Sequence, residues 1–185
     1  HCDQNASYIG TDRSTPRAPK QEFFAKPNIL EIVSNLFDAT FNPTGFSVEV
    51  VTSKPLSILD ACTNEINNSV RREIADAGAD IRQTLRIQQS IAQKNFEKLN
   101  QLKEELIANI SKCFAQKESY GCYFSAIQKV IRAVQAQTHS FFPVDNVKIF
   151  FRLGELFKSL KNEYAKFYVC LVRHHSYITA WKRKC

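Results

Sequence analysis

The sequence predicts an all-α protein built on a disulfide-stapled antiparallel helical hairpin, either straight or folded into a four-helix or larger bundle. Apolar residues recur every three or four positions over most of residues 56–171, which is the period of an amphipathic helix. Only 5 glycines and 6 prolines occur in 185 residues, too few for the turns of a many-stranded β-protein. Chains of this size usually favour the compact bundle, because it buries more surface than a rod.

The chain divides near residue 54 into an N-terminal arm and a helical domain. Residues 1–27 are polar, carry three of the six prolines and read as an extended arm tied down at Cys2. Residues 28–39 place apolar side chains on one helical face, and 46–51 alternate like a short strand or an extended connector. We therefore expect 1–54 to hold one short helix and a connector, and 55–185 to form the helical domain.

The helical domain has three long periodic stretches. Residues 56–117 read as one long helix or as two helices with a break near 88–94, and Ser57 and Asp60 offer caps at its start. After a turn at 117–121, residues 120–134 form the next helix, which Pro143 and its neighbours end. Asp145 or Asn146 caps a last long helix.

The six cysteines have a spacing that predicts how the helices pair. Cys62 and Cys113 are 51 positions apart, Cys122 and Cys170 are 48 apart, and the turn lies between these two arms. If the two arms pair in antiparallel fashion, Cys113 meets Cys122 at the turn, and Cys62 meets Cys170 at the far end. We predict the pairs Cys113–Cys122, Cys62–Cys170 and Cys2–Cys185. A folded bundle would also allow Cys62–Cys113 with Cys122–Cys170, and fifteen pairings exist in all.

The cysteine pattern also indicates a secreted glycoprotein. An even number of dispersed cysteines with no CxxC pair fits disulfides better than a zinc or redox motif. Three acceptor sequons, at Asn5, Asn67 and Asn109, agree with this compartment. The chain opens on His1, as a mature protein does after signal removal. No apolar run approaches the 18 or so residues of a membrane span.

Most enzymatic chemistry has no counterpart in the sequence. There is no GxSxG, P-loop, GxGxxG or HExxH motif. His174 and His175 are adjacent, so they point about 100° apart on a helix and make a poor pair of metal ligands. Glu104 and Glu105 lie among lysines, as on a solvated helix face. We expect no catalytic residue, no metal and no cofactor.

The charge distribution is more informative than the total. Residues 119–185 contain eleven Lys and Arg against three Asp and Glu, a net charge of +8, whereas the whole chain has +7. Such a face attracts heparin-like glycans, anionic lipid heads or an acidic protein. The alternative is that these charges only keep the protein soluble. Nucleic acid is an electrostatically possible partner, but it fits poorly with a secreted protein. The predicted polyanion-binding or partner-binding residues are Lys129, Arg132, Lys148, Arg152, Lys158, Lys161, Lys166, Arg173, Lys182, Arg183 and Lys184.

Aromatic residues give a second hypothesis. The chain has 14 Phe and no Met. The late ones either fill the core of a bundle or line an apolar cavity for a lipid or other small ligand, which would make the protein a carrier. A four-helix cytokine-like signal shares the length, disulfides and sequons and is the third hypothesis. The late cluster comprises Phe141, Phe142, Phe150, Phe151, Phe157 and Phe167.

The array of Cys62, Cys113, the aromatic-flanked segment Tyr120 to Phe124 (YGCYF) and Cys170 resembles a known family. It looks like the secreted insect helical proteins with a TsetseEP-type domain, and in outline like the aegyptin-like salivary proteins of blood-feeding insects. The resemblance covers about 60–170. It implies a secreted, non-enzymatic insect protein, in saliva for example, that modulates host haemostasis or immunity. The acidic repeats of some relatives are missing here.

Overall fold

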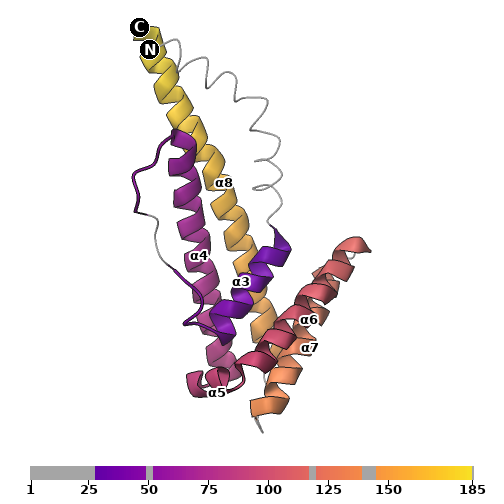
Figure 1. The fold of residues 1–185 in the computed structure, drawn as a ribbon. Coiled ribbons are helices and arrows are strands. Elements are labelled where there is room, and N and C mark those ends of the chain that lie inside the picture. The colour runs from indigo at the N-terminus through magenta and orange to yellow at the C-terminus, as the bar shows by residue number, and fades with distance from the viewer. Residues whose placement is uncertain (1–27, 49–51, 117–119, 139–144, 185) are drawn as a thin grey trace. The chain divides into compact units, whose positions relative to one another are not determined.

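The computed structural model describes residues 28–48, 52–116, 120–138 and 145–184, and the side-chain surroundings within these ranges as far as His175. These ranges contain helices and no β-strand, which confirms the predicted all-α class (Figure 1). In chain order the helices are α3 (Ile29–Phe41), α4 (Ile58–Leu85), α5 (Gln89–Lys94), α6 (Phe96–Ala115), α7 (Tyr120–Thr138) and α8 (Asn146–Lys184).

The two longest helices begin at residues that cap them, as the sequence predicts. Ser57 Oγ accepts a hydrogen bond from the backbone N–H of Asp60 at 3.1 Å. Asp145 Oδ1 accepts one from the N–H of Lys148, also at 3.1 Å. Each side chain satisfies an N–H that has no partner within the first turn of its helix.

The predicted break near 88–94 is a connector with a short helix inside it. Arg86 has a φ of 53°, in the left-handed region, and this reverses the backbone at the end of α4. Helix α5 follows, and Asn95 separates it from α6. Ile87 and Ala92 are buried, so the connector is packed into the protein.

The described chain forms two compact units, each with its own core. The first contains the start of α4, up to Arg71, and α8 from Lys158 onward, running antiparallel side by side (Figure 1). The second contains α3, the rest of α4, α5, α6, α7 and the first part of α8. The first core contains Cys62, Ile66, Leu160, Tyr164, Phe167 and Cys170. The second contains, among others, Ile32, Val33, Leu36, Phe37, Ile74, Ile81, Leu106, Ile110, Ile127, Ile131, Ile149 and Leu153.

Helix α3 is part of the second unit, where it packs with residues of α4 and α6. The Arg82 guanidinium donates from Nη1 to the carbonyl oxygens of Ala39 at 2.6 Å and Thr40 at 3.3 Å, near the end of α3. Lys103 Nζ forms an ion pair with Asp38 at 2.8 Å. These partners come from α4 and α6, more than 40 positions away, and no local pattern could reveal them.

The straight hairpin is excluded within the second unit. Side chains from α3, α4, α6, α7 and α8 surround one small cavity there, so these helices form a bundle. The strand considered over 46–51 is absent from its described part, since residues 46–48 have no regular structure. Residues 49–51 and the N-terminal arm 1–27 lie outside the described residues.

Candidate functional site

Two disulfides link the helices in the pairing predicted from the spacing. Cys62 on α4 bonds to Cys170 on α8 in the first unit, and Cys113 on α6 bonds to Cys122 on α7 in the second. The Cα atoms are 5.9 Å apart in each pair, within the range that disulfides span. The alternative pairing of Cys62 with Cys113 is thereby excluded. Cys2 and Cys185 lie outside the described residues.

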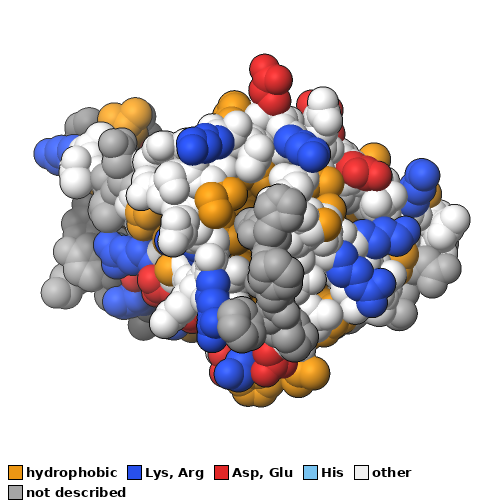
Figure 2. Space-filling view, turned by 90° about the horizontal axis from the view of Figure 1, so that it is seen from below, with side chains coloured by type: hydrophobic (Ala, Val, Ile, Leu, Met, Phe, Trp, Pro, Cys, Tyr) orange, Lys and Arg blue, Asp and Glu red, His pale blue; other side chains and the backbone are white. Residues whose placement is uncertain are grey.

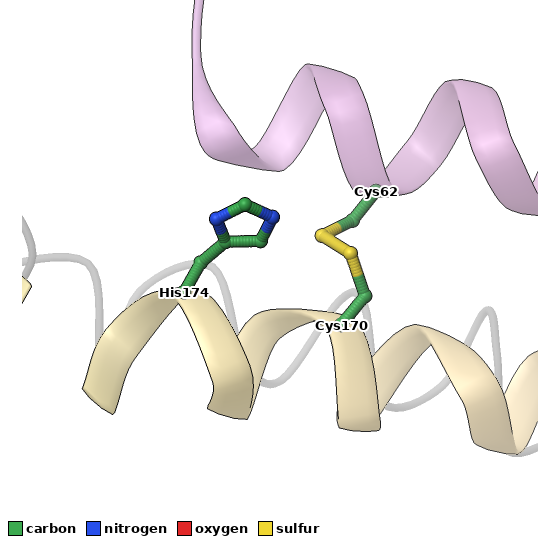
Figure 3. A group of neighbouring side chains, drawn as sticks. All are labelled: Cys62, Cys170 and His174. Atoms are coloured by element: carbon green, nitrogen blue, oxygen red, sulfur yellow. A yellow bond between two sulfur atoms is a disulfide. The ribbon is translucent and has the colours of Figure 1, made fainter. Parts of the chain in front are cut away.

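His174 lies beside the Cys62–Cys170 disulfide, a position that the sequence analysis missed (Figure 3). The two sulfurs and a ring nitrogen of His174 lie within 4.8 Å of one another, and His174 is partly buried. Glu65 brings its Oε2 to 3.8 Å from Cys170 Sγ. A disulfide sulfur carries no proton, so that contact is not a hydrogen bond.

The spacing of these residues in the sequence is a signal for this cluster. Cys170 and His174 are four positions apart on one helix, and Cys62 and Glu65 are three apart on another. Both spacings place side chains on the same helical face. Comparing His174 with its neighbour His175 overlooks this spacing, because adjacent residues on a helix point about 100° apart.

The basic residues predicted to bind a partner are mostly exposed, but they divide between the two units. On the face drawn in Figure 2, Lys and Arg side chains occur in several separate places among acidic and apolar ones. Lys158, Lys161, Lys166 and Arg173 are exposed in the first unit, and Lys129, Arg132 and Lys148 in the second. The side chains of Lys182, Arg183 and Lys184 lie outside the described ones.

Two of the predicted binding residues form ion pairs within the protein. Arg152 Nε lies 2.6 Å from Asp80 Oδ2, and its Nη1 lies 3.7 Å from Glu155 Oε2. Lys166 Nζ lies 2.7 Å from Glu163 Oε1, one turn earlier on α8. Because Arg152 is about four-fifths buried and already neutralised, it contributes less to an external contact than Lys158 or Lys161.

The late Phe residues are absent from the lining of the cavity in the second core. The small cavity in the second core has a volume of about 40 Å³, far below the 300 Å³ or more of a typical ligand pocket. Its aromatic lining comes from Phe37 and Phe41 of α3. The late Phe residues differ in their surroundings. Phe167 is buried in the first unit, Phe150 packs on Phe124, Phe157 is half-buried and Phe151 is 68% exposed. Phe141 and Phe142 lie outside the described residues.

A surface hollow of about 240 Å³ lies where the turn after α3 meets α5 and the start of α6. Its lining consists of uncharged residues, including Asn42, Thr44, Gln89, Gln93 and Phe96. None of these side chains titrates near neutral pH, so the hollow offers no general acid or base. Glu104 and Glu105, the paired carboxylates considered in the sequence, are not part of this lining and are exposed on α6.

Burial shifts one phenol on α8. The Tyr168 ring lies beside Phe167, with the ring centroids 5.9 Å apart. Desolvation raises the pKa of the Tyr168 hydroxyl above its ordinary value of about 10. The phenol is therefore neutral at physiological pH.

Two of the three sequons lie on described helices. Asn67 is exposed on α4, whereas Asn109 is half-buried on α6, where the Ser111 hydroxyl of its sequon donates to the carbonyl of Ile107 at 2.9 Å. Asn5 lies outside the described residues. Asn67 is thus the more accessible acceptor of the two.

Of the helices in the described ranges, none combines the length and apolarity needed to cross a membrane.

Comparisons with known proteins find no relative of this chain. No family model, no curated protein and no solved structure matches the chain.

Proposed function

We propose that the protein is a secreted, non-enzymatic binding protein that occupies an acidic extracellular partner through exposed cations of α8. The observation that carries this proposal is the charge of α8 from Lys158 to His175. This stretch carries four basic residues and one acidic residue, Glu163, and all four basic side chains are exposed. A surface with so little compensating negative charge attracts polyanions such as sulfated glycans.

Several features support secretion. The two disulfides close loops of 108 and 9 positions, and structural disulfides persist in oxidising compartments. The exposed Asn67 sequon fits the same compartment. The resemblance to helical proteins of insect saliva supports a host target, for which haemostasis and immunity are the proposed settings.

The carrier hypothesis has weaker support. The core cavity of about 40 Å³ holds one or two water molecules at most, so a lipid would require the second unit to open. The cytokine-like alternative has no observation in its favour beyond the helical bundle itself. We therefore keep polyanion binding as the proposed function.

Salt-dependent retention on heparin tests the proposal. We expect the protein to bind at low ionic strength and elute as salt screens the contacts. Reversing two charges, Lys158→Glu with Lys161→Glu, should weaken binding by about 1–2 kcal/mol, or roughly five- to thirtyfold. The matched control is Lys98→Glu with Lys112→Glu on α6, which changes net charge equally at exposed positions.

The control separates a local surface from a net-charge effect. Equal weakening by both double variants would contradict a site on α8. No retention of the unaltered protein at low salt would contradict polyanion binding itself.

A further inference from the structure

Three side chains of the types that bind metal ions meet between α4 and α8 in the first unit, and a fourth lies beside one of them. Cys62, Cys170 and His174 form the one such group of three found among the described residues, with their ligand atoms within 4.8 Å of one another. The Glu65 carboxylate lies 3.8 Å from the Cys170 sulfur and adds a fourth donor. Figure 3 shows the imidazole and the two sulfurs in the space between the two helices.

The helices supply these donors in a regular way. Helix α4 contributes Cys62 and Glu65, three positions apart, and α8 contributes Cys170 and His174, four positions apart. Each spacing points both side chains of a helix toward its partner. Metal sites in helical bundles are built in this way, from side chains on facing helices that project toward one another.

The donor set selects the ion. Thiolates and imidazole favour zinc in tetrahedral coordination, and a carboxylate is an accepted fourth ligand. Zinc–sulfur and zinc–nitrogen bonds of about 2.3 and 2.0 Å place neighbouring ligand atoms about 3.5–3.8 Å apart. The two sulfurs and the His174 nitrogen already lie within 4.8 Å of one another. The Glu65 carboxylate lies outside this group of three, 3.8 Å from Cys170 Sγ, and has to rotate inward to complete the set. The Cα atoms of the two cysteines are only 5.9 Å apart, so neither helix has to move.

In the oxidised protein the site is closed, because the two sulfurs are bonded to each other and neither is a thiolate. We propose that Cys62, Cys170, His174 and Glu65 form a zinc site that opens when this disulfide is reduced. The same two sulfurs then hold either a covalent link or a zinc ion. This inference concerns the first unit's own chemistry and does not depend on polyanion binding.

The exchange balances with a dithiol as the reductant. The dithiol gives two electrons and two protons to the Cys62–Cys170 bond and ends as its own disulfide, leaving two thiols. Zinc then replaces the two thiol protons, which pass to solvent. Cys62 and Cys170 are 0% and 3% exposed, and a buried pair of thiolates is costly unless a cation neutralises it.

Reduced full-length protein, freed from dithiol by anaerobic gel filtration, tests the proposal with Co²⁺ as a spectroscopic probe and Zn²⁺ as competitor. We expect intense visible bands of tetrahedral cobalt, a sulfur-to-cobalt charge-transfer band, and their loss as zinc displaces cobalt. His174→Ala should lower zinc affinity at least about tenfold, a loss seen even for groups that only support a ligand. His175→Ala, the neighbouring histidine, is the matched control and should bind as the unaltered protein does.

A second measurement locates the sulfurs and does not require the reduced protein to remain folded. Zinc should protect Cys62 and Cys170 from alkylation, read by mass spectrometry of peptides, and should leave Cys113 and Cys122 reactive. If reduction unfolds the first unit, zinc should restore helical circular dichroism in the unaltered protein but not in His174→Ala. The proposal is overturned by equal zinc affinity of the two histidine variants or by equal binding of zinc to the oxidised protein. It is also overturned if zinc protects Cys113 and Cys122 as well as it protects Cys62 and Cys170.

Discussion

Gly78 is the position where a single methyl group tests the packing of the second unit most directly. It is buried on α4. A β-carbon added there would lie 2.7 Å from Ala39 Cβ, 2.9 Å from the Ala39 carbonyl carbon and 3.1 Å from the Thr40 nitrogen. Carbon atoms in contact normally lie 3.5–4.0 Å apart. None of these neighbours can rotate away, so α3 would have to shift.

The size of the effect follows from two opposing contributions. Overpacking a core costs about 1–3 kcal/mol, and alanine gains about 1 kcal/mol over glycine inside a helix. The net of these two contributions is about 0–2 kcal/mol. Because three atoms that cannot rotate away lie within 3.1 Å of the added carbon, we expect Gly78→Ala to lower the free energy of unfolding by an amount in the upper half of that range, about 1–2 kcal/mol. At about 2–4 °C per kcal/mol for a chain of this size, Tm falls by roughly 2–8 °C.

Gly154→Ala on α8 is the matched control, because nothing lies within 4 Å of the added carbon. Only the helix-propensity gain remains, so Tm should rise by about 2–4 °C. Both substitutions reduce the freedom of the unfolded chain equally, and their difference isolates the contact with α3. Thermal unfolding followed by far-ultraviolet circular dichroism measures both. A rise of equal size in the two variants would refute the close packing of α3 on α4.

Three further outcomes are expected. Replacing both cysteines of Cys62–Cys170, which are 108 positions apart, by alanine should lower the free energy of unfolding by about 4.8 kcal/mol through chain entropy. The same change at Cys113–Cys122, which are 9 positions apart, should lower it by about 2.6 kcal/mol. Urea unfolding measures both, and equal losses would contradict the dependence on loop length. Arg82→Ala removes the charged hydrogen bonds at the end of α3 and should cost about 2 kcal/mol in urea unfolding; an unchanged midpoint would argue against them. In a glycosylating host, Asn67→Gln should remove a glycan detected by gel shift while Asn109→Gln should not, and the reverse result would contradict the exposure of the two acceptors.

The helices and their ends were predictable because the information is local. The apolar period marks each buried face, and caps such as Ser57 and Asp145 act on N–H groups three residues later. The two described disulfides were also predictable, because the equal spacing of cysteines around a turn constrains antiparallel helices. In each of these cases the partners are set by position along the chain.

The candidate sites were predicted less well, because their partners are distant in sequence. Arg152 was assigned to an external surface, but Asp80, 72 positions earlier, forms an ion pair with it. His174 was judged a poor metal ligand as the neighbour of His175, but Cys62 on another helix lies beside it. Charge and residue type identify candidates, whereas folding decides which of them meet.

The sequence by itself determined the all-α class, the caps at the starts of α4 and α8, the two described disulfides and the concentration of positive charge after residue 119. Each of these depends on periodicity, spacing or count. Only the tertiary structure decided that α3 packs into the second unit against Gly78, that Arg152 is already neutralised, and that His174 and Glu65 lie beside the Cys62–Cys170 disulfide. These depend on distances between helices, which no single helical repeat contains.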